Sequence, residues 1–126
     1  MVAQKLMGLA LAGALGTLAR YGLASFVQKA SNQTFPVGTL AANLAGCFLA
    51  GLLWTLFESR WPVSGEMRSV VLVGFMGAFT TFSAFILETG LLARSSEWLY
   101  VVGNIFLQNG LGLAALTVGV VLGRAI

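Results

Sequence analysis

The segment from Gly74 to Phe85 most constrains what this chain can fold into. It reads Gly-Phe-Met-Gly-Ala-Phe-Thr-Thr-Phe-Ser-Ala-Phe and lies in the middle of a long apolar stretch. In lipid, every backbone N–H and C=O needs a partner, and irregular backbone persists only where protein buries it or where it lines a cavity. The glycines and adjacent threonines therefore predict a helix broken at mid-membrane depth, where an ion or a polar solute can bind.

Composition places the whole chain in the membrane. Of its 126 residues, 58% are hydrophobic and 9% are charged, whereas soluble domains carry roughly a quarter charged residues. The mean hydropathy is +0.91. The net charge is only +3, with no run of Lys or Arg. Nucleic-acid binding is therefore not expected, since it needs clustered cations.

Four apolar spans follow one another along the sequence. They are predicted at residues 4–29, 37–58, 68–94 and 98–124, each longer than the roughly 20 residues that cross a bilayer core. The connections between them are short. We therefore predict an all-α integral membrane protein with a single four-helix domain over residues 1–126, whose third helix is broken near its middle.

The first span has an alternative interpretation as a cleaved secretory signal. Lys5 precedes an apolar stretch that contains Ala12-Gly13-Ala14, a small-residue pattern like those at cleavage sites. The apolar stretch continues past Arg20 to Val27, however, which favours a retained span.

Small residues recur at intervals of four in three of the spans. Examples are Gly8, Ala12 and Gly16, then Gly38, Ala42, Gly46 and Ala50, and finally Gly119 and Gly123. This spacing lets membrane helices approach closely, so it predicts a compact bundle.

The charges hardly decide which way the chain inserts. Four spans put both termini on one side, and Lys5, Arg60, Arg68 and Arg124 are expected there. Lys29, Arg94 and, depending on its depth, Arg20 are expected on the other side. With so weak a bias, either these few charges set one orientation or the chain inserts both ways and pairs with its inverted copy. Four helices without long loops hardly enclose a pathway, which favours an oligomer.

Polar residues inside the spans are candidates for function. Asn43 lies near the centre of the second span, with Thr39 one turn earlier on the same face. A buried carboxamide needs partners, so Asn43 either joins helices or binds an anion through its two N–H donors. Arg20 either extends to the membrane surface or draws anions into an entrance. Glu88 either pairs with Arg20 or lines a vestibule.

Phe82 and Phe85 lie three residues apart and so share a helix face. Core packing is one explanation. Aromatic rings are positive at the edge, however, and ring edges could hold a small anion without trapping it, as conduction requires. The hydroxyls of Thr39, Thr81 and Ser83 would add donors.

The sequence offers little for catalysis. It has no histidine, one cysteine (Cys47) and no pair of carboxylates within a span. An enzyme is therefore not expected, and Cys47 provides neither a disulfide nor a set of metal ligands.

Three motifs, in this order, resemble the Fluc (CrcB) family of fluoride channels. They are Gly16-Thr17-Leu18-Ala19-Arg20-Tyr21, Gly38-Thr39-Leu40-Ala41-Ala42-Asn43, and the highly specific segment from Gly74 to Phe85. Length and number of spans agree as well, so the resemblance covers essentially the whole chain.

The resemblance implies an antiparallel, dual-topology homodimer in the bacterial inner membrane that exports cytoplasmic fluoride passively through two pores. It makes Phe82 and Phe85 the pore phenylalanines and Asn43 a donor to fluoride. The hydroxyl lining would come from Thr39, Thr81 and Ser83, and Arg20 matches the arginine of the family's first helix. Glu88 remains a candidate for a vestibule.

The resemblance also implies a structural Na⁺ on the dimer axis, held by main-chain carbonyls at the helix break. Gly77 and Thr80 match those positions. The chain departs from the family at Ala78, where the motif has a second glycine. It departs again in the fourth span, whose polar candidates are Gln108, Asn109 and Thr117.

Two other functions remain as alternatives. A small multidrug-resistance exporter has the same size, but it needs an acidic residue central in the membrane, typically on the first helix, and only Glu88 is available here. An assembly subunit of a larger membrane complex would not function as a self-contained dimer.

Overall fold

The computed structural model describes residues 1–126 and is entirely helical. The elements are α1 (Val2–Ser31), α2 (Val37–Ser59), α3 (Gly65–Ser69), the π-helix η1 (Val70–Phe75), α4 (Met76–Phe79), α5 (Phe82–Arg94) and α6 (Trp98–Ala125). Together α3, η1, α4 and α5 form one interrupted rod. Four helices are long and apolar enough to cross a membrane: Val2–Ser31, Val37–Ser59, Gly65–Arg94 and Trp98–Ala125. The predicted all-α class with four such helices is confirmed.

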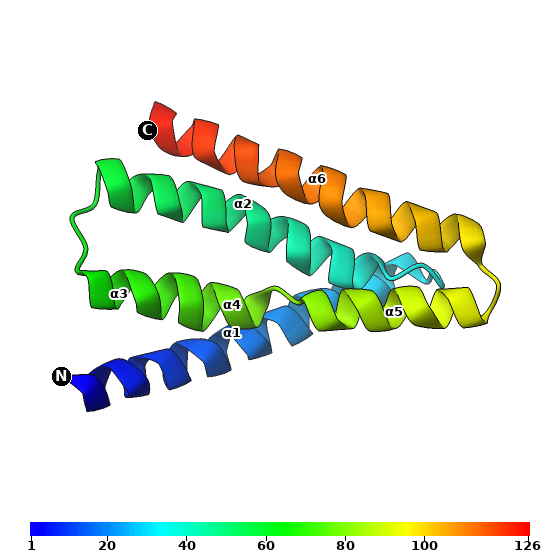
Figure 1. Cartoon of the computed structure of the whole chain (residues 1–126), viewed down its shortest axis with the longest axis horizontal. Helices are drawn as coiled ribbons and strands as arrows, with labels where there is room; N and C mark the ends of the chain where they lie inside the picture. Colours follow the sequence, from blue (N-terminus) through cyan, green and yellow to red (C-terminus); the bar gives the residue numbers. More distant parts are fainter.

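Both termini lie at the same end of the bundle (Figure 1). The connection between α2 and α3 is at that end too, and the α1–α2 and α5–α6 connections are at the other. α2 packs along α6, while α1 crosses the rod and contacts η1 and α4. The break between α4 and α5 thus lies at mid-length, with α1 and α2 both close to it.

The third helix is broken at Thr80 and Thr81, which confirms the predicted interruption. Both residues are extended, with φ −92° and ψ 158° at Thr80 and φ −149° and ψ 119° at Thr81. The Thr80 hydroxyl donates back to the Met76 carbonyl at 3.0 Å. The Thr81 hydroxyl caps α5 by accepting from the Ala84 N–H at 3.2 Å. Two adjacent threonines thus satisfy part of the backbone that the break exposes.

A π-helical turn precedes the break, a feature that sequence periodicity does not predict. It covers Val70–Phe75, and its extra residue rotates the following helix by about 100° relative to a continuous α-helix. Gly74 in this turn faces α1, where an added Cβ would come within 3.0 Å of the Ala12 Cβ. On α1, a Cβ at Gly16 would collide with the Phe75 carbonyl. Because the facing residues of α1 are small, the π turn packs directly against the α1 backbone.

The α2–α6 contact also depends on glycine. An added Cβ at Gly51 would collide with the carbonyl of Leu116, and one at Gly119 with the carbonyl of Phe48. The two backbones therefore lie in direct contact, as the spacing of small residues predicts. This contact holds α6 against the part of α2 that carries the candidate site.

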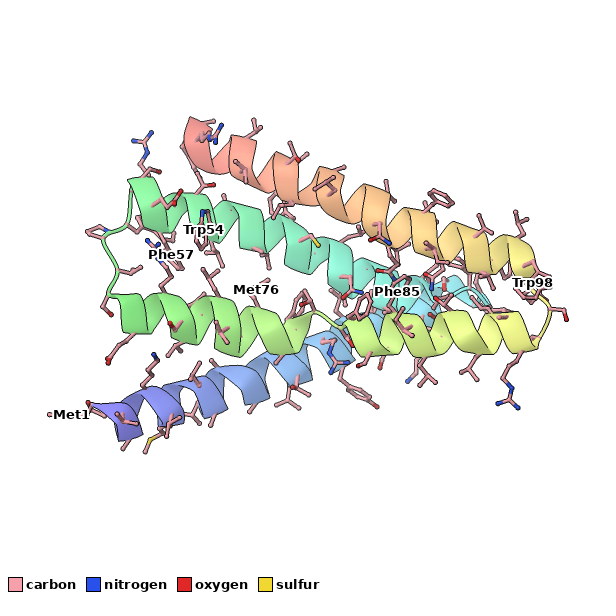
Figure 2. All side chains as sticks on the ribbon, in the orientation of Figure 1. Met1, Trp54, Phe57, Met76, Phe85 and Trp98 are labelled. Carbon is pink, nitrogen blue, oxygen red and sulfur yellow. The ribbon has the colours of Figure 1, made fainter.

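Aromatic side chains lie towards both ends of the bundle. Figure 2 shows Trp54 near the end where α2 meets α3, and Trp98 at the opposite end. The Arg68 guanidinium lies 5.6 Å from the centre of the Trp54 ring and donates to the Phe57 carbonyl at 2.8 Å. Such amphipathic rings suit the two membrane interfaces.

Candidate functional site

The side chain of Asn43, on α2, forms hydrogen bonds with the backbone at the helix break. Its Oδ1 accepts from the Thr81 N–H at 2.8 Å, and its Nδ2 donates to the Thr81 carbonyl at 3.0 Å. Nδ2 also donates to Oε1 of Gln108 on α6 at 3.0 Å. Both amide hydrogens of Asn43 are therefore used within this chain. Of the two predicted roles, the structure shows the one that joins helices.

Arg20 supports the same break from α1. Its Nε donates to the Ala78 carbonyl at 3.0 Å. That carbonyl belongs to the last turn of α4, where the helix dipole favours a cation. Arg20 thus bonds to the helix break and does not extend to the membrane surface, and Glu88 bonds to Thr39 and not to Arg20. The role of Arg20 in drawing anions into an entrance stays a prediction.

The break leaves main-chain oxygens without helical partners. In a continuous helix the Gly77 carbonyl would accept from the Thr81 N–H, which instead donates to Asn43. The Thr80 carbonyl would accept from the Ala84 N–H, which instead donates to the Thr81 hydroxyl, and no other donor reaches it. Oxygen atoms of this kind suit a hard cation. The donor set at Gly77 and Thr80 therefore fits a bound Na⁺.

The two phenylalanines that follow the break, Phe82 and Phe85, contact one another. They differ in their exposure to solvent. Their ring centres are 5.7 Å apart and the ring planes meet at 60°. Phe85 is buried, and Figure 2 shows it on the side of α5 that faces α2 and α6. Phe82 is 74% exposed. One ring is thus fixed by packing, while the other borders open space.

A cavity of about 570 Å³ lies between α2, the interrupted rod and α6. It collects six of the predicted residues: Asn43, Gly77, Thr80, Thr81, Phe82 and Phe85. Gln108 lines it from α6. Ser83 is exposed just outside, with its hydroxyl 3.5 Å from that of Thr81. The cavity therefore combines an aromatic wall, hydroxyls, carboxamides and free carbonyl oxygens.

Thr39 and Glu88 belong to a second cavity, nearer the α1–α2 connection. The Thr39 hydroxyl donates to Oε1 of Glu88 at 2.6 Å, and Oε2 of Glu88 is buried without a partner. This cavity measures about 320 Å³ and is also lined by Gln28 and Lys29. Thr39 thus points away from the cavity that Asn43 borders, although the two residues are one turn apart on α2.

Sequence reasoning missed a polar chain between α5 and α6. Asn104 is fully buried; its Nδ2 donates to the Thr89 hydroxyl at 2.9 Å, and that hydroxyl donates to the Phe85 carbonyl at 2.7 Å. Gln108 Nε2 lies 3.5 Å from Asn104 Oδ1. The available signal was the spacing of Asn104 and Gln108, four residues apart on one face of α6.

Comparison with known proteins gives the family. The family model described as "CrcB-like protein, Camphor Resistance (CrcB)" matches residues 7–120. The chain belongs to the CrcB family. Its relatives include a protein from Desulforapulum autotrophicum that is 68% identical over 97% of this chain and 98% of its own. Relatives from Nitrosococcus oceani and Solidesulfovibrio magneticus are 48% and 49% identical over 98% of both chains. All three carry the name "Fluoride-specific ion channel FluC".

In this CrcB chain the residues predicted for the site thus fall into three groups. One group lines the larger cavity, with Ser83 just outside it; Thr39 and Glu88 line the smaller cavity; and Arg20, on α1, bonds to the break. Of the fourth-span candidates, Gln108 and Asn109 border the larger cavity. Thr117 donates within its own helix, to the Leu113 carbonyl.

Proposed function

We propose that this chain forms a fluoride channel that exports cytoplasmic fluoride passively across the bacterial inner membrane. The observation that carries the proposal is the broken third helix, because the break brings Phe82 and Phe85 to a cavity that also holds polar groups. The name of the relatives specifies the anion.

The chemistry of this cavity suits a small, strongly hydrated anion. Fluoride gives up its water only where donors replace it, and aromatic ring edges offer positive charge that binds weakly enough for release. In the proposal, ions pass the edges of Phe82 and Phe85, with the hydroxyls of Thr81 and Ser83 beside the path. Asn43 borders this path as well. Since its amide hydrogens are already bound, its part is to hold Thr81 and Gln108 in place.

A second, inverted copy of the chain would complete the pathway. Phe82 is mostly exposed in the single chain. One side of the proposed ion path is therefore not covered by protein. An antiparallel homodimer covers that side and, by its two-fold symmetry, gives two equivalent pores. The weak charge asymmetry between the two ends of the bundle supports insertion in both orientations.

We further propose that the free carbonyls of Gly77 and Thr80 hold a structural Na⁺ on the dimer axis. Gly77 is exposed, and a Cβ added there would meet no atom within 4 Å, so a partner can approach this backbone. When bound, Na⁺ supplies positive charge beside the anion paths and links the two protomers.

The second cavity is proposed as a vestibule. Lys29 provides a cation on its lining, and Arg20 adds positive charge deeper in the protein, at the break. Glu88 and Thr39 line the same cavity as Lys29 and would form the polar side of the route.

Fluoride efflux from proteoliposomes tests the proposal. Wild-type protein is expected to release fluoride but not chloride, without a proton gradient. Phe82→Ile and Phe85→Ile each remove a ring edge from the path, so each should lower fluoride flux at least tenfold while the purified protein stays monodisperse.

Phe26→Ile is the matched control, because Phe26 is 72% exposed on α1, away from the cavity. Full flux in both cavity variants would contradict the assigned pathway. Transport that depends on a pH gradient would instead favour a multidrug-resistance type of exporter.

A further inference from the structure

Gln28, near the end of α1, uses its whole carboxamide on the connection between α1 and α2. Its Nε2 donates to the carbonyls of Gln33 and Phe35, at 2.7 and 3.1 Å. Its Oε1 accepts from the Gly38 N–H at 3.0 Å. A main-chain N–H can only donate and a carbonyl can only accept, so these partners fix which end of the amide is which. One side chain of α1 thus bonds to three points of the chain that leads into α2.

The bond to Gly38 caps α2, which has no cap of its own. Pro36 occupies the N-cap position and forms no side-chain hydrogen bond there. Gly38 is buried, so without Gln28 its N–H would be unsatisfied away from water, which is costly. Gln28 therefore supplies from α1 the acceptor that an N-cap residue usually provides.

Close packing fixes the start of α2 on two sides. On the α1 side, a Cβ added at Gly38 would collide with the Ala24 carbonyl and would lie 3.2 Å from the Gln28 Cβ. On the α6 side, the Phe35 ring packs edge-on against the Tyr100 ring, with the ring centres 5.6 Å apart. The connection therefore has a defined position against both neighbours.

The capped turn carries a residue of the second cavity. Thr39 directly follows Gly38, is buried, and donates to Oε1 of Glu88 at 2.6 Å. Gln28 lines this cavity together with all three of these residues. It also borders a third cavity of about 300 Å³, which is formed by polar side chains of α1 and of the connection. A shift of the first turn of α2 would therefore move the Thr39 hydroxyl away from Glu88.

We propose that Gln28 is a positioning residue for the entrance of the ion path: its amide holds the start of α2 so that Thr39 stays in contact with Glu88. The inference rests on the proposed function, in which the second cavity is the vestibule. Gln28 acts through Thr39 and does not itself need to meet the ion. The α1–α2 connection then serves as a fixed wall of the vestibule.

Gln28→Met tests the inference, because it removes all three hydrogen bonds and keeps the length of the side chain. Fluoride flux in proteoliposomes should fall roughly three- to tenfold, the range that corresponds to one weakened hydrogen bond. Thr39→Val should lower the flux by a similar factor. Because both changes act on the same contact, the double variant should have the flux of Thr39→Val alone. Two independent structural defects would instead multiply.

Ser31→Ala is the matched control at the same end of α1, because the Ser31 hydroxyl donates only to the main-chain carbonyl of Gln28. It should keep wild-type flux. The second readout is limited trypsin digestion in detergent at Lys29, which is exposed beside the connection. Cleavage there requires the end of α1 to open locally, so it should be faster in Gln28→Met and unchanged in Ser31→Ala.

Wild-type flux and wild-type cleavage in monodisperse Gln28→Met would overturn the inference and leave the proposed function standing. Flux losses that multiply in the double variant would also overturn it, since Gln28 would then not act through Thr39. If Gln28→Met does not purify as a monodisperse protein, the same measurements on Gln28→Asn, whose amide is too short for all three bonds, decide in the same way. Absence of fluoride flux in the wild-type protein would overturn the proposed function and this inference with it.

Discussion

At the scale of single residues, Asn43 replaces the hydrogen bonds that a helix break removes. One carboxamide satisfies both the N–H and the C=O of Thr81 and contacts α6 through Gln108. Such groups are costly to bury unpaired in lipid. The same residue therefore stabilises the break and orients the polar wall of the cavity.

Asn43→Ala should destabilise the protein because it leaves the N–H and the C=O of Thr81 without hydrogen-bond partners. Each unsatisfied group costs roughly 1–3 kcal/mol, so we expect a clearly lower midpoint of thermal unfolding in detergent. Asn109→Ala is the control, since Asn109 is exposed and donates only to the Ile105 carbonyl of its own helix. Equal midpoints in the two variants would show that Asn43 does not hold the break.

Thr39→Val tests the contact between α2 and α5. The Thr39 hydroxyl is the only partner of the Glu88 carboxylate, whose Oε2 is buried and unpaired. Its removal should destabilise the protein by roughly 1–3 kcal/mol, measured by thermal unfolding. Thr39→Ser keeps the hydroxyl and should stay close to wild type. A Thr39→Val protein as stable as Thr39→Ser would contradict this account of the second cavity.

At the scale of elements, the interrupted rod depends on close packing against small residues of its neighbours. α1 presents Gly16 to the Phe75 carbonyl, and α2 presents Gly46 to the Thr80 side chain. The π turn and the extended pair of threonines thus each lie opposite a glycine. Side chains at these positions would push the rod away and shift the break.

Gly46→Ala should destabilise the protein, because the new Cβ would collide with the Thr80 Cγ2 methyl. Overpacking of this kind typically costs about 1–3 kcal/mol. Adding Thr80→Ser removes the methyl and keeps the hydroxyl that bonds to Met76, so the double variant should recover most of the stability and of the fluoride flux.

Gly22→Ala is the control for this pair, because a Cβ there meets no atom within 4 Å. It should be neutral or slightly stabilising, since alanine favours a helix by about 1 kcal/mol over glycine. Failure of Thr80→Ser to rescue Gly46→Ala would show that the methyl contact is not the cause.

At the scale of the whole molecule, a single chain does not close the larger cavity on all sides. The larger cavity is bordered by α2, the interrupted rod and α6, with Phe82 exposed, and in the proposed dimer an inverted second copy would close it. In the proposed antiparallel dimer, insertion in both orientations would depend on the weak bias of Lys and Arg between the two ends. We therefore expect charge placement to control assembly.

A strong excess of cations at one end should lock the orientation of the chain. One variant carries Gln33→Lys and Thr34→Lys in the α1–α2 connection together with Lys5→Gln and Arg60→Gln at the opposite end, and the other variant carries two lysines after Ile126. Each alone should fail to protect fluoride-sensitive bacteria, and co-expression should restore resistance. Full resistance from either locked variant alone, at wild-type expression, would argue against an antiparallel dimer.

The sequence by itself determined the membrane class, the four apolar helices and the position of the helix break. These follow from local chemistry: apolar length, and glycine and threonine placed where lipid demands a satisfied backbone. The family motifs also directed attention to the residues that line the larger cavity.

Only the tertiary structure decided which groups the polar side chains bond to. It assigned Arg20 to the Ala78 carbonyl, Thr39 to Glu88, and both amide hydrogens of Asn43 to groups within the same chain. The π turn and the chain through Asn104 also appeared only there. The physical reason is that a donor's partner depends on the distance and direction of groups on other helices, which helix packing sets and local sequence does not encode.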